Sequence, residues 1–177
     1  IDRVMLPQLK QLVTNYKPAL LFSDGDWWMD YKKWRTLQFL SWALNNAANK
    51  DELVFNDRWG KVRGKHGGYY TTEYGSGFAD GTIPWEENRG IGMSFGINRI
   101  ENIDDYRTDK ELIFMLVDIV SRGGNLLLNI GPNADGTIPV IMQQRLIEIG
   151  NWLSVCGEGI YNTEQWIKDS QWLSLIH

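Results

Sequence analysis

Several features that mark particular classes of protein are absent or scarce in this sequence. Its single cysteine, Cys156, excludes a disulfide bond within the chain. No run of about 18 apolar residues is present, so no membrane-spanning helix is expected. The formal net charge of −4 argues against a nucleic-acid partner, because such a partner needs a basic surface. The composition is otherwise ordinary for a globular protein.

Histidine is also scarce, with only His66 and His177. Neither has the His–Cys or His–Glu spacing of a metal site. The "DGD" and "NADG" triplets are similar to the start of a calcium loop, but the remaining ligands do not follow. We therefore expect neither a metal ion nor a cofactor.

Aromatic residues, in contrast, are abundant: nine Trp, seven Tyr and six Phe in 177 residues. They recur in loop-like segments as well as in periodic ones. Two interpretations are open, a tryptophan-rich core and a set of rings that face a sugar. The chain begins with Ile1 rather than Met, so we expect a fragment whose N-terminus and any targeting signal lie outside it.

Hydrophobic periodicity predicts short strands that alternate with amphipathic helices. Helices are expected over residues 4–15, 31–46, 109–121 and 139–155. Strands are expected over 19–22, 52–55, 69–74 and 125–131, and a glycine-spaced strand over 90–97 after a long loop at 75–89. The expected buried stripes are Leu9 and Leu12 in the first helix; Trp34, Leu37, Leu40, Ser41 and Leu44 in the second; and Leu146, Ile149, Trp152 and Leu153 in the last.

This alternation indicates parallel strands joined by helices and predicts an α/β barrel. In such folds the chemistry collects in the loops that follow the strands. The segments "SDGDWW", "NDRWG" and "TEYG" fall in those places, and they carry acids beside large aromatic rings. The acids beside Trp or Tyr are Asp24, Asp26, Asp57, Glu73, Glu86 and Glu87.

Paired carboxyl groups beside aromatic rings are typical of glycoside hydrolases. Hydrolysis with retention needs a nucleophile and an acid/base about 5 to 5.5 Å apart, and hydrolysis with inversion needs a wider separation. Sugar rings also present apolar C–H patches, against which an aromatic ring can pack. The pattern therefore favours an enzyme that acts on sugars.

Six longer motifs make the interpretation more specific. They are "SDGDW", "NDRWG", "YYTTEYG", "PWEENRGIGMSFGINR", "LVDIVSRGGNLLLNIGPNADGTIP" and "RLIEIGNWLSVCGEGIYNT". Together and in this order they resemble the α-L-fucosidases of glycoside hydrolase family 29. The resemblance implies a retaining enzyme that removes terminal α-L-fucose from fucosylated oligosaccharides or glycoconjugates through a covalent fucosyl-enzyme intermediate.

The resemblance also implies the fold, which is a (β/α)8-like, TIM-type barrel of irregular strand number. Residues 1–160 would form the C-terminal half of this catalytic barrel. Residues 161–177 would begin the connection to a trailing β-sandwich. Because half a barrel cannot close, we expect the activity to belong to the parent enzyme and not to the fragment alone.

The family's catalytic roles carry over to individual residues. The resemblance makes Asp24 the nucleophile and leaves Asp26 to support the turn. For the acid/base it indicates either Glu73 or Glu86. We favour Glu73, because a strand end holds geometry better than a mobile loop. Glu87 is expected to be a solvated neighbour.

The resemblance further implies the residues that hold the sugar. Arg58 would contact a fucose hydroxyl or keep a catalytic carboxylate ionised, with a plain ion pair to Asp57 as the alternative. Phe95 would pack on the C6 methyl group. Candidates for the surrounding wall are Phe22, Trp59, Trp85 and, as a loop residue near the site, His66; for the two tryptophans a core position is the alternative.

Other functions remain open at this level. They are a fucose-binding protein without catalysis and a related barrel glycosidase such as a galactosidase. The resemblance indicates a secreted, periplasmic or lysosomal protein and leaves oligomerisation open.

Overall fold

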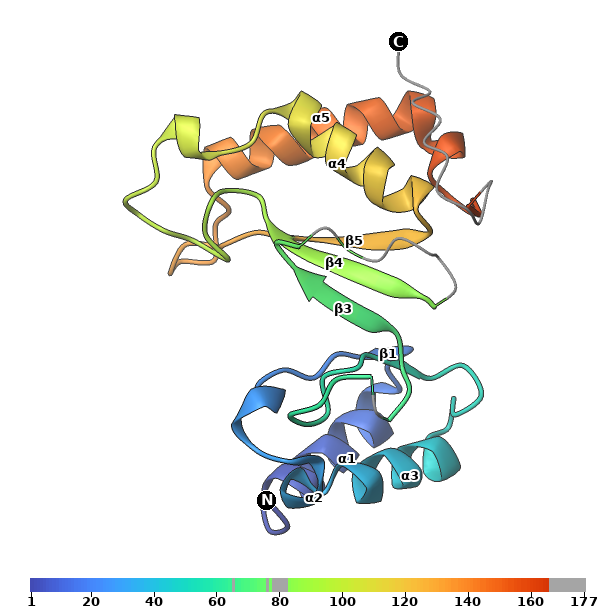
Figure 1. The fold of residues 1–177 in the computed structure, drawn as a ribbon. Coiled ribbons are helices and arrows are strands. Elements are labelled where there is room, and N and C mark those ends of the chain that lie inside the picture. Colours follow the sequence, from blue (N-terminus) through green and yellow to red (C-terminus); the bar gives the residue numbers. More distant parts are fainter. Residues whose placement is uncertain (65, 76, 78–82, 166–177) are drawn as a thin grey trace. The chain divides into compact units, whose positions relative to one another are not determined.

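The computed structural model describes residues 1–64, 66–75, 77 and 83–165, which form an α/β protein (Figure 1). The chain divides into two compact units, residues 1–71 and residues 72–177. Each unit has its own helices and parallel strands. Among the described residues, every helix is too short or too polar to cross a membrane.

The described residues of the first unit form three helices and two very short strands, and they include the start of β3 (Tyr70–Glu73). The helices are α1 (Met5–Tyr16), α2 (Tyr31–Trp34) and α3 (Thr36–Asn46), and a 3₁₀ turn, η1, covers Asp26–Trp28. Strands β1 (Leu20–Leu21) and β2 (Val54–Phe55) pair in parallel, with Leu20 opposite Val54. Beyond β2, Asn56 forms a further parallel bridge with Tyr69. The predicted strands are confirmed, although both are shorter than expected.

The core of the first unit lies between α1 and α3. The Phe39 ring stacks on the Trp59 ring, with 5.4 Å between their centroids. The buried cluster consists of Leu6, Val13, Phe39, Leu40, Ala43, Ala47, Leu53 and Trp59. The predicted stripes were partly wrong, because Leu12, Leu37 and Leu44 are exposed.

A break at Arg35 explains the shifted stripe. The sequence predicted one helix over 31–46, but Arg35 has a left-handed conformation, with a φ of 62°, and separates α2 from α3. Its guanidinium pairs with Asp2 at 3.3 Å, and the neighbouring Thr36 hydroxyl donates to the Trp59 carbonyl. The restart at Thr36 turns Phe39 and Ala43, and not Leu37 and Leu44, toward the core.

The described residues of the second unit form a three-stranded sheet and two long helices. The strand order is β3 (Tyr70–Glu73), β4 (Trp85–Gly90), β5 (Gly124–Asn129), and the first residues of β3 still belong to the first unit. Strands β4 and β5 are parallel, with Trp85 opposite Gly124 and Gly90 opposite Asn129. Helix α4 (Asp109–Ser121) packs on β5, and α5 (Val140–Cys156) packs on α4 (Figure 1). The described residues of this unit also form two 3₁₀ turns, η2 (Ile103–Asp105) and η3 (Gly157–Gly159).

Two predictions for the second unit were wrong. Residues 85–89 were assigned to a loop but form most of β4, and the strand expected over 90–97 is a series of bends. The chain folds back directly after β4: a Cβ atom on Gly90 would lie 2.2 Å from the Ser94 carbonyl oxygen. The glycines of this segment therefore allow a tight bend and not an extended strand. The predicted helices at 109–121 and 139–155 are confirmed as α4 and α5.

Of the predicted tail over 161–177, residues 166–177 lie outside the described part of the chain. The α/β class and the parallel pairing agree with the sequence-based expectation.

Candidate active site

The loop after β1 is tied to the end of β2 by a buried amide. The Ser23 backbone N–H donates to Oδ1 of Asn56 at 3.1 Å, and Nδ2 of Asn56 donates back to the Ser23 carbonyl at 2.8 Å. The Ser23 hydroxyl also donates to the Arg58 carbonyl. Asn56 is fully buried, so these bonds act in a water-poor environment. They fix the backbone immediately before Asp24.

Asp24 combines exposure with a fixed cationic partner. Its side chain is 55% exposed, and its Oδ1 accepts a hydrogen bond from Nη1 of Arg58 at 3.1 Å. The next residue, Gly25, has a φ of +83°, a left-handed conformation that glycine adopts without strain. The turn after Asp24 is therefore made by the glycine, and the Asp24 carboxylate faces solvent beside a guanidinium.

Asp26, in contrast, is a buried structural residue. It begins η1, is almost fully buried, and accepts from Nε and Nη2 of Arg63 at 3.2 and 3.4 Å. This placement agrees with the predicted role in supporting the turn. The two acids of "SDGDWW" therefore differ, with Asp24 at the surface and Asp26 inside.

Arg58 is almost fully buried, at 2% exposed, and its contacts include the side chains of Asp24, Thr71 and Phe22. Besides its bond to Asp24, its Nε donates to the Thr71 hydroxyl at 2.7 Å, and its guanidinium lies 5.1 Å from the centre of the Phe22 ring. The sequence left open a plain ion pair with Asp57. The structure joins Arg58 to Asp24, and the charge of Arg58 also acts on the neighbouring Asp57 carboxyl.

Asp57 precedes Arg58 in the chain and is buried, at 6% exposed. It accepts from the Thr71 hydroxyl at 2.7 Å. Burial raises the pKa of the Asp57 carboxyl above its usual value, and the Thr71 hydrogen bond and the charges of Arg63 and Arg58 offset only part of this effect. Thr71 was not identified from the sequence, because a threonine in a strand gives no signal of its bonding partners.

A cavity of about 230 Å³ lies beside these residues within the first unit. Ser23, Asp24, Arg58 and Trp59 line it, together with apolar side chains of α1 and α3. Its volume is below the range of about 300–1,000 Å³ that ligand pockets usually have. It therefore has the size of part of a site. Trp59 lines this cavity and is also a core residue, stacked on Phe39.

The acids of the second unit occupy different positions along their strands. Glu73 is the last residue of β3 and is exposed, whereas Glu86 is the second residue of β4 and is half-buried. Glu87 was expected to be solvated but is 2% exposed, which corrects that prediction. Its carboxylate accepts from the Thr72 hydroxyl, from the Gly75 N–H at 3.1 Å and from Nε of Arg89 at 2.6 Å.

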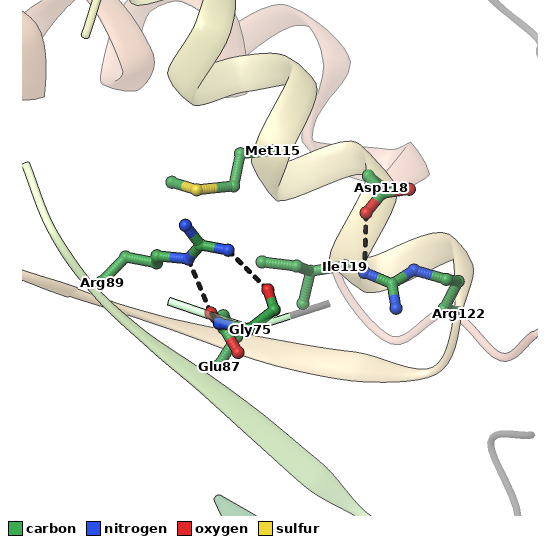
Figure 2. Close-up of a pocket in the computed structure, with 7 residues that line it drawn as sticks. All are labelled: Gly75, Glu87, Arg89, Met115, Asp118, Ile119 and Arg122. Carbon is green, nitrogen blue, oxygen red and sulfur yellow. Dashed lines mark hydrogen bonds and ion pairs between the residues drawn. The ribbon is translucent and has the colours of Figure 1, made fainter. Parts of the chain in front are cut away.

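Figure 2 shows Glu87, Gly75 and Arg89 beside a cavity of about 210 Å³ that is also lined by residues of α4. Arg89 bridges Glu87 and the Gly75 carbonyl, and Arg122 pairs with Asp118 at 2.7 Å. Each charge drawn in this cavity therefore has an opposite charge beside it. Glu87 is buried because it lies in mid-strand, where Arg89 compensates it.

The remaining predicted wall residues are placed as follows. Trp85 is 0% exposed, and its ring lies against Gly124 and 5.2 Å from the Arg122 guanidinium, which favours the core interpretation. Phe95 is half-exposed, and its ring packs edge-to-face with the Tyr74 ring, with 6.4 Å between the two centroids. Two other rings belong to the first unit: Phe22, partly exposed, and His66, whose ring centroid lies 4.4 Å from that of Tyr31.

Within the described residues, no group of three or more His, Cys, Asp or Glu side chains is close enough together to hold a metal ion.

Comparisons with known proteins all match this chain to the same family. The family model described as Alpha-L-fucosidase matches residues 2–158. The chain is 44% identical to an α-L-fucosidase of Dictyostelium discoideum over 168 residues, which are 94% of this chain and 36% of that protein. It is 47% identical to the plasma α-L-fucosidase of Rattus norvegicus over 167 residues, 91% of this chain and 36% of that protein.

Solved structures agree with these matches. The α-fucosidase of Thermotoga maritima, in complex with a mechanism-based inhibitor, superimposes with a TM-score of 0.77 at 40% identity. That match covers 91% of this chain and 35% of the Thermotoga chain. The chain thus spans about a third of the length of these relatives. By its sequence and its fold, it belongs to the α-L-fucosidase family.

Proposed function

We propose that the protein to which this chain belongs is a retaining α-L-fucosidase. It would remove terminal α-L-fucose from fucosylated oligosaccharides or glycoconjugates through a covalent fucosyl-enzyme intermediate. The observation that carries this proposal is the exposed Asp24 carboxylate, which lies in the loop after the parallel strand β1 and is paired with the buried Arg58. Membership of the family supplies the substrate class.

We infer that the chain is the C-terminal half of a (β/α)8-like barrel. The parallel strands, the helices between them and the similarity to the Thermotoga α-fucosidase support this inference. Catalytic groups of such barrels lie at the carboxyl ends of the strands. Asp24 follows β1, Arg58 follows β2 and Glu73 ends β3, which agrees with this rule. The activity would require the rest of the barrel.

The proposed first step is attack of Asp24 on the anomeric carbon. A nucleophilic carboxylate must be ionised, and a guanidinium at hydrogen-bond distance favours the charged form. Arg58 supplies this group at 3.1 Å. The bond from Asp24 to the anomeric carbon forms as the bond to the leaving oxygen breaks. The acid/base donates its proton to that oxygen and, in the second step, takes a proton from the attacking water.

We propose Glu73 as this acid/base, with Glu86 as the alternative. Glu86 is four residues before the carboxyl end of β4, which corresponds to about 13 Å along a strand at about 3.3 Å per residue. Glu73 is at the carboxyl end of its own strand. The barrel rule therefore supports Glu73. Phe95, whose ring is half-exposed, is proposed to pack on the C6 methyl group of fucose.

The test uses the full-length protein and a fluorogenic α-L-fucoside. Asp24→Gly is expected to lower kcat by several orders of magnitude, and added azide should restore turnover and give a fucosyl azide, because a small anion can occupy the place of the missing carboxylate. Asp51→Gly, at an exposed turn of the same unit, serves as the matched control and should retain the wild-type rate. An Asp24→Gly variant with the wild-type rate would contradict the proposal.

The same assay separates the two glutamates. Loss of the general acid slows substrates with poor leaving groups far more than activated aryl fucosides, since activated groups leave without protonation. We expect this pattern for Glu73→Ala and not for Glu86→Ala. Fucose binding without turnover by the wild-type protein would instead indicate a binding protein. A faster rate on galactosides than on fucosides would indicate a galactosidase.

A further inference from the structure

We propose that Thr71 is a positioning residue for this reaction, because its hydroxyl joins the buried Asp57 to the arginine that pairs with Asp24. The proposal rests on the proposed function. It concerns how the nucleophile is held, and it gives a role to a residue that lies in the "YYTTEYG" motif but was assigned none from the sequence.

The proposal starts from a continuous row of hydrogen bonds in the first unit. The Thr71 hydroxyl donates to Oδ1 of Asp57 at 2.7 Å. Nε of Arg58 donates to the same Thr71 oxygen at 2.7 Å. Nη1 of Arg58 then donates to Oδ1 of Asp24 at 3.1 Å. A guanidinium N–H only donates and a carboxylate oxygen only accepts, so the Thr71 hydroxyl accepts from Arg58 and donates to Asp57.

The hydroxyl of Thr71 is suited to its central place. It has a single proton, which it gives to Asp57, and its lone pairs are then free to accept from Arg58. Hydrogen bonds in such a row polarise and strengthen one another. A side chain without a hydroxyl would leave both Asp57 and the Arg58 Nε without this partner.

The planar guanidinium converts this bond into an orientation for Asp24. A guanidinium has its five N–H groups in a rigid fork, so fixing Nε and the plane also fixes Nη1. Thr71 fixes Nε, and the Phe22 ring lies 5.1 Å from the guanidinium carbon. Nη1 is thereby aimed at the exposed Asp24 carboxylate.

Burial separates the support from the reacting group. Arg58, Thr71 and Asp57 are 2%, 4% and 6% exposed, whereas the Asp24 side chain is 55% exposed. Three buried groups therefore hold one group that is open to a substrate. Without the Thr71 hydroxyl, the buried Asp57 carboxylate would compete with Asp24 for the Arg58 cation. Asp24 would then lose orientation but not exposure.

The test compares two substitutions at Thr71 in the full-length protein. Thr71→Val keeps the shape of the side chain and removes the hydroxyl, and Thr71→Ser keeps the hydroxyl. Hydrogen bonds to charged groups are worth enough for their loss to change a rate on the order of tenfold. We therefore expect Thr71→Val to lower kcat about tenfold with little change in KM, and Thr71→Ser to stay within about threefold of wild type.

A second readout reports the nucleophile directly. A 2-deoxy-2-fluoro-fucosyl fluoride traps the fucosyl-enzyme, and the rate of this labelling should fall in Thr71→Val by the same factor as kcat. Thr72→Val is the matched control, because the Thr72 hydroxyl bonds to Glu87 and not to Arg58. It should leave the labelling rate unchanged. If Thr71→Val does not fold, Thr71→Cys replaces it, since a thiol is a weak hydrogen-bond partner.

Three results would overturn the proposal: wild-type labelling in Thr71→Val, an equal loss in Thr72→Val, or an equal loss in Thr71→Ser. These results differ from failure of the proposed function. If Asp24→Gly is inactive and Thr71→Val is unaffected, only the positioning role fails. If Asp24→Gly keeps full activity, the proposed mechanism and the positioning role fail together.

Discussion

Replacement of Trp85 by alanine tests whether this ring is part of the core or a platform for sugar. The side chain has no exposed surface and lies against Gly124 of the neighbouring strand. A buried tryptophan removes about 150–250 Å² from water, which corresponds to about 4–6 kcal/mol at 25 cal/mol per Å². Measured Trp→Ala substitutions in cores cost about 3–5 kcal/mol. We therefore expect a loss of about 3–5 kcal/mol in local stability around β4 and β5.

Hydrogen exchange of the full-length protein measures this loss where it occurs. The amides of Gly124–Asn129 in β5 should lose protection by a factor of at least about 100, because each 1.4 kcal/mol changes an equilibrium about tenfold. Trp28→Ala is the control, since the Trp28 ring is 76% exposed and should cost little. Unchanged protection together with a raised KM for a fucoside would refute the core interpretation of Trp85.

Three further predictions concern stability. The Asp57→Asn variant should gain stability relative to wild type as the pH rises from about 3.8 toward the raised pKa of Asp57 in the folded protein. In this pH range the Asp57 carboxyl of the folded wild type still holds a proton that the unfolded chain has released, so the wild type loses stability as the pH rises. Unfolding at several pH values measures the difference in stability, and a difference that does not depend on pH would contradict the prediction. Gly124→Ala places a Cβ atom 2.4 Å from the Trp85 ring and should destabilise the protein by about 1–3 kcal/mol. Gly150→Ala in α5 has open space around it and should stabilise the protein by about 0.5–1 kcal/mol. Thermal melting compares the two variants, and equal effects would contradict the packing argument. Thr108→Ala removes the side-chain cap of α4 and should cost about 1 kcal/mol, read from the same melting curves against Thr108→Ser, which keeps the cap.

The long helices and the buried strands could be predicted from the sequence because their patterns are local. Helix α4 begins at a Thr–x–x–Glu capping box, formed by Thr108 and Glu111, and carries a continuous apolar face. The run of leucines in β5 is typical of a strand in a parallel sheet. In both segments the composition alone favours one structure.

Strand β4 could not be predicted, because its side chains are polar on both faces. Its sequence, WEENRG, has the composition of a loop. It is stable as a strand because partners distant in the sequence satisfy its polar groups: Thr72 donates to Glu87, and Nδ2 of Asn88 donates to the Thr72 carbonyl. Such long-range compensation is invisible to local periodicity.

The candidate site shows the same division. The resemblance to the family indicated Asp24 and Arg58 by their motifs. The sequence offered Asp57 only as a possible ion-pair partner of Arg58, and it gave Thr71 no role, since the Thr71 hydroxyl acts through contacts between the end of β2 and the start of β3. The motifs therefore indicated the residues proposed to contact a substrate, whereas the role of Thr71, which lies within one of the same motifs, was identified only by geometry.

The reciprocal bonds between Ser23 and Asn56 have a consequence for protein engineering. Strands β1 and β2 contain only two residues each, so few backbone hydrogen bonds join them. The side-chain amide of Asn56 adds two hydrogen bonds that hold the loop after β1 against the end of β2. An aspartate at that place would keep the acceptor and lose the donor, which would release the Ser23 carbonyl. A small shift of the Asp24 carboxylate is therefore best engineered by substitutions at Asn56, which change its hydrogen bonds to Ser23 and leave the sequence of the loop unchanged.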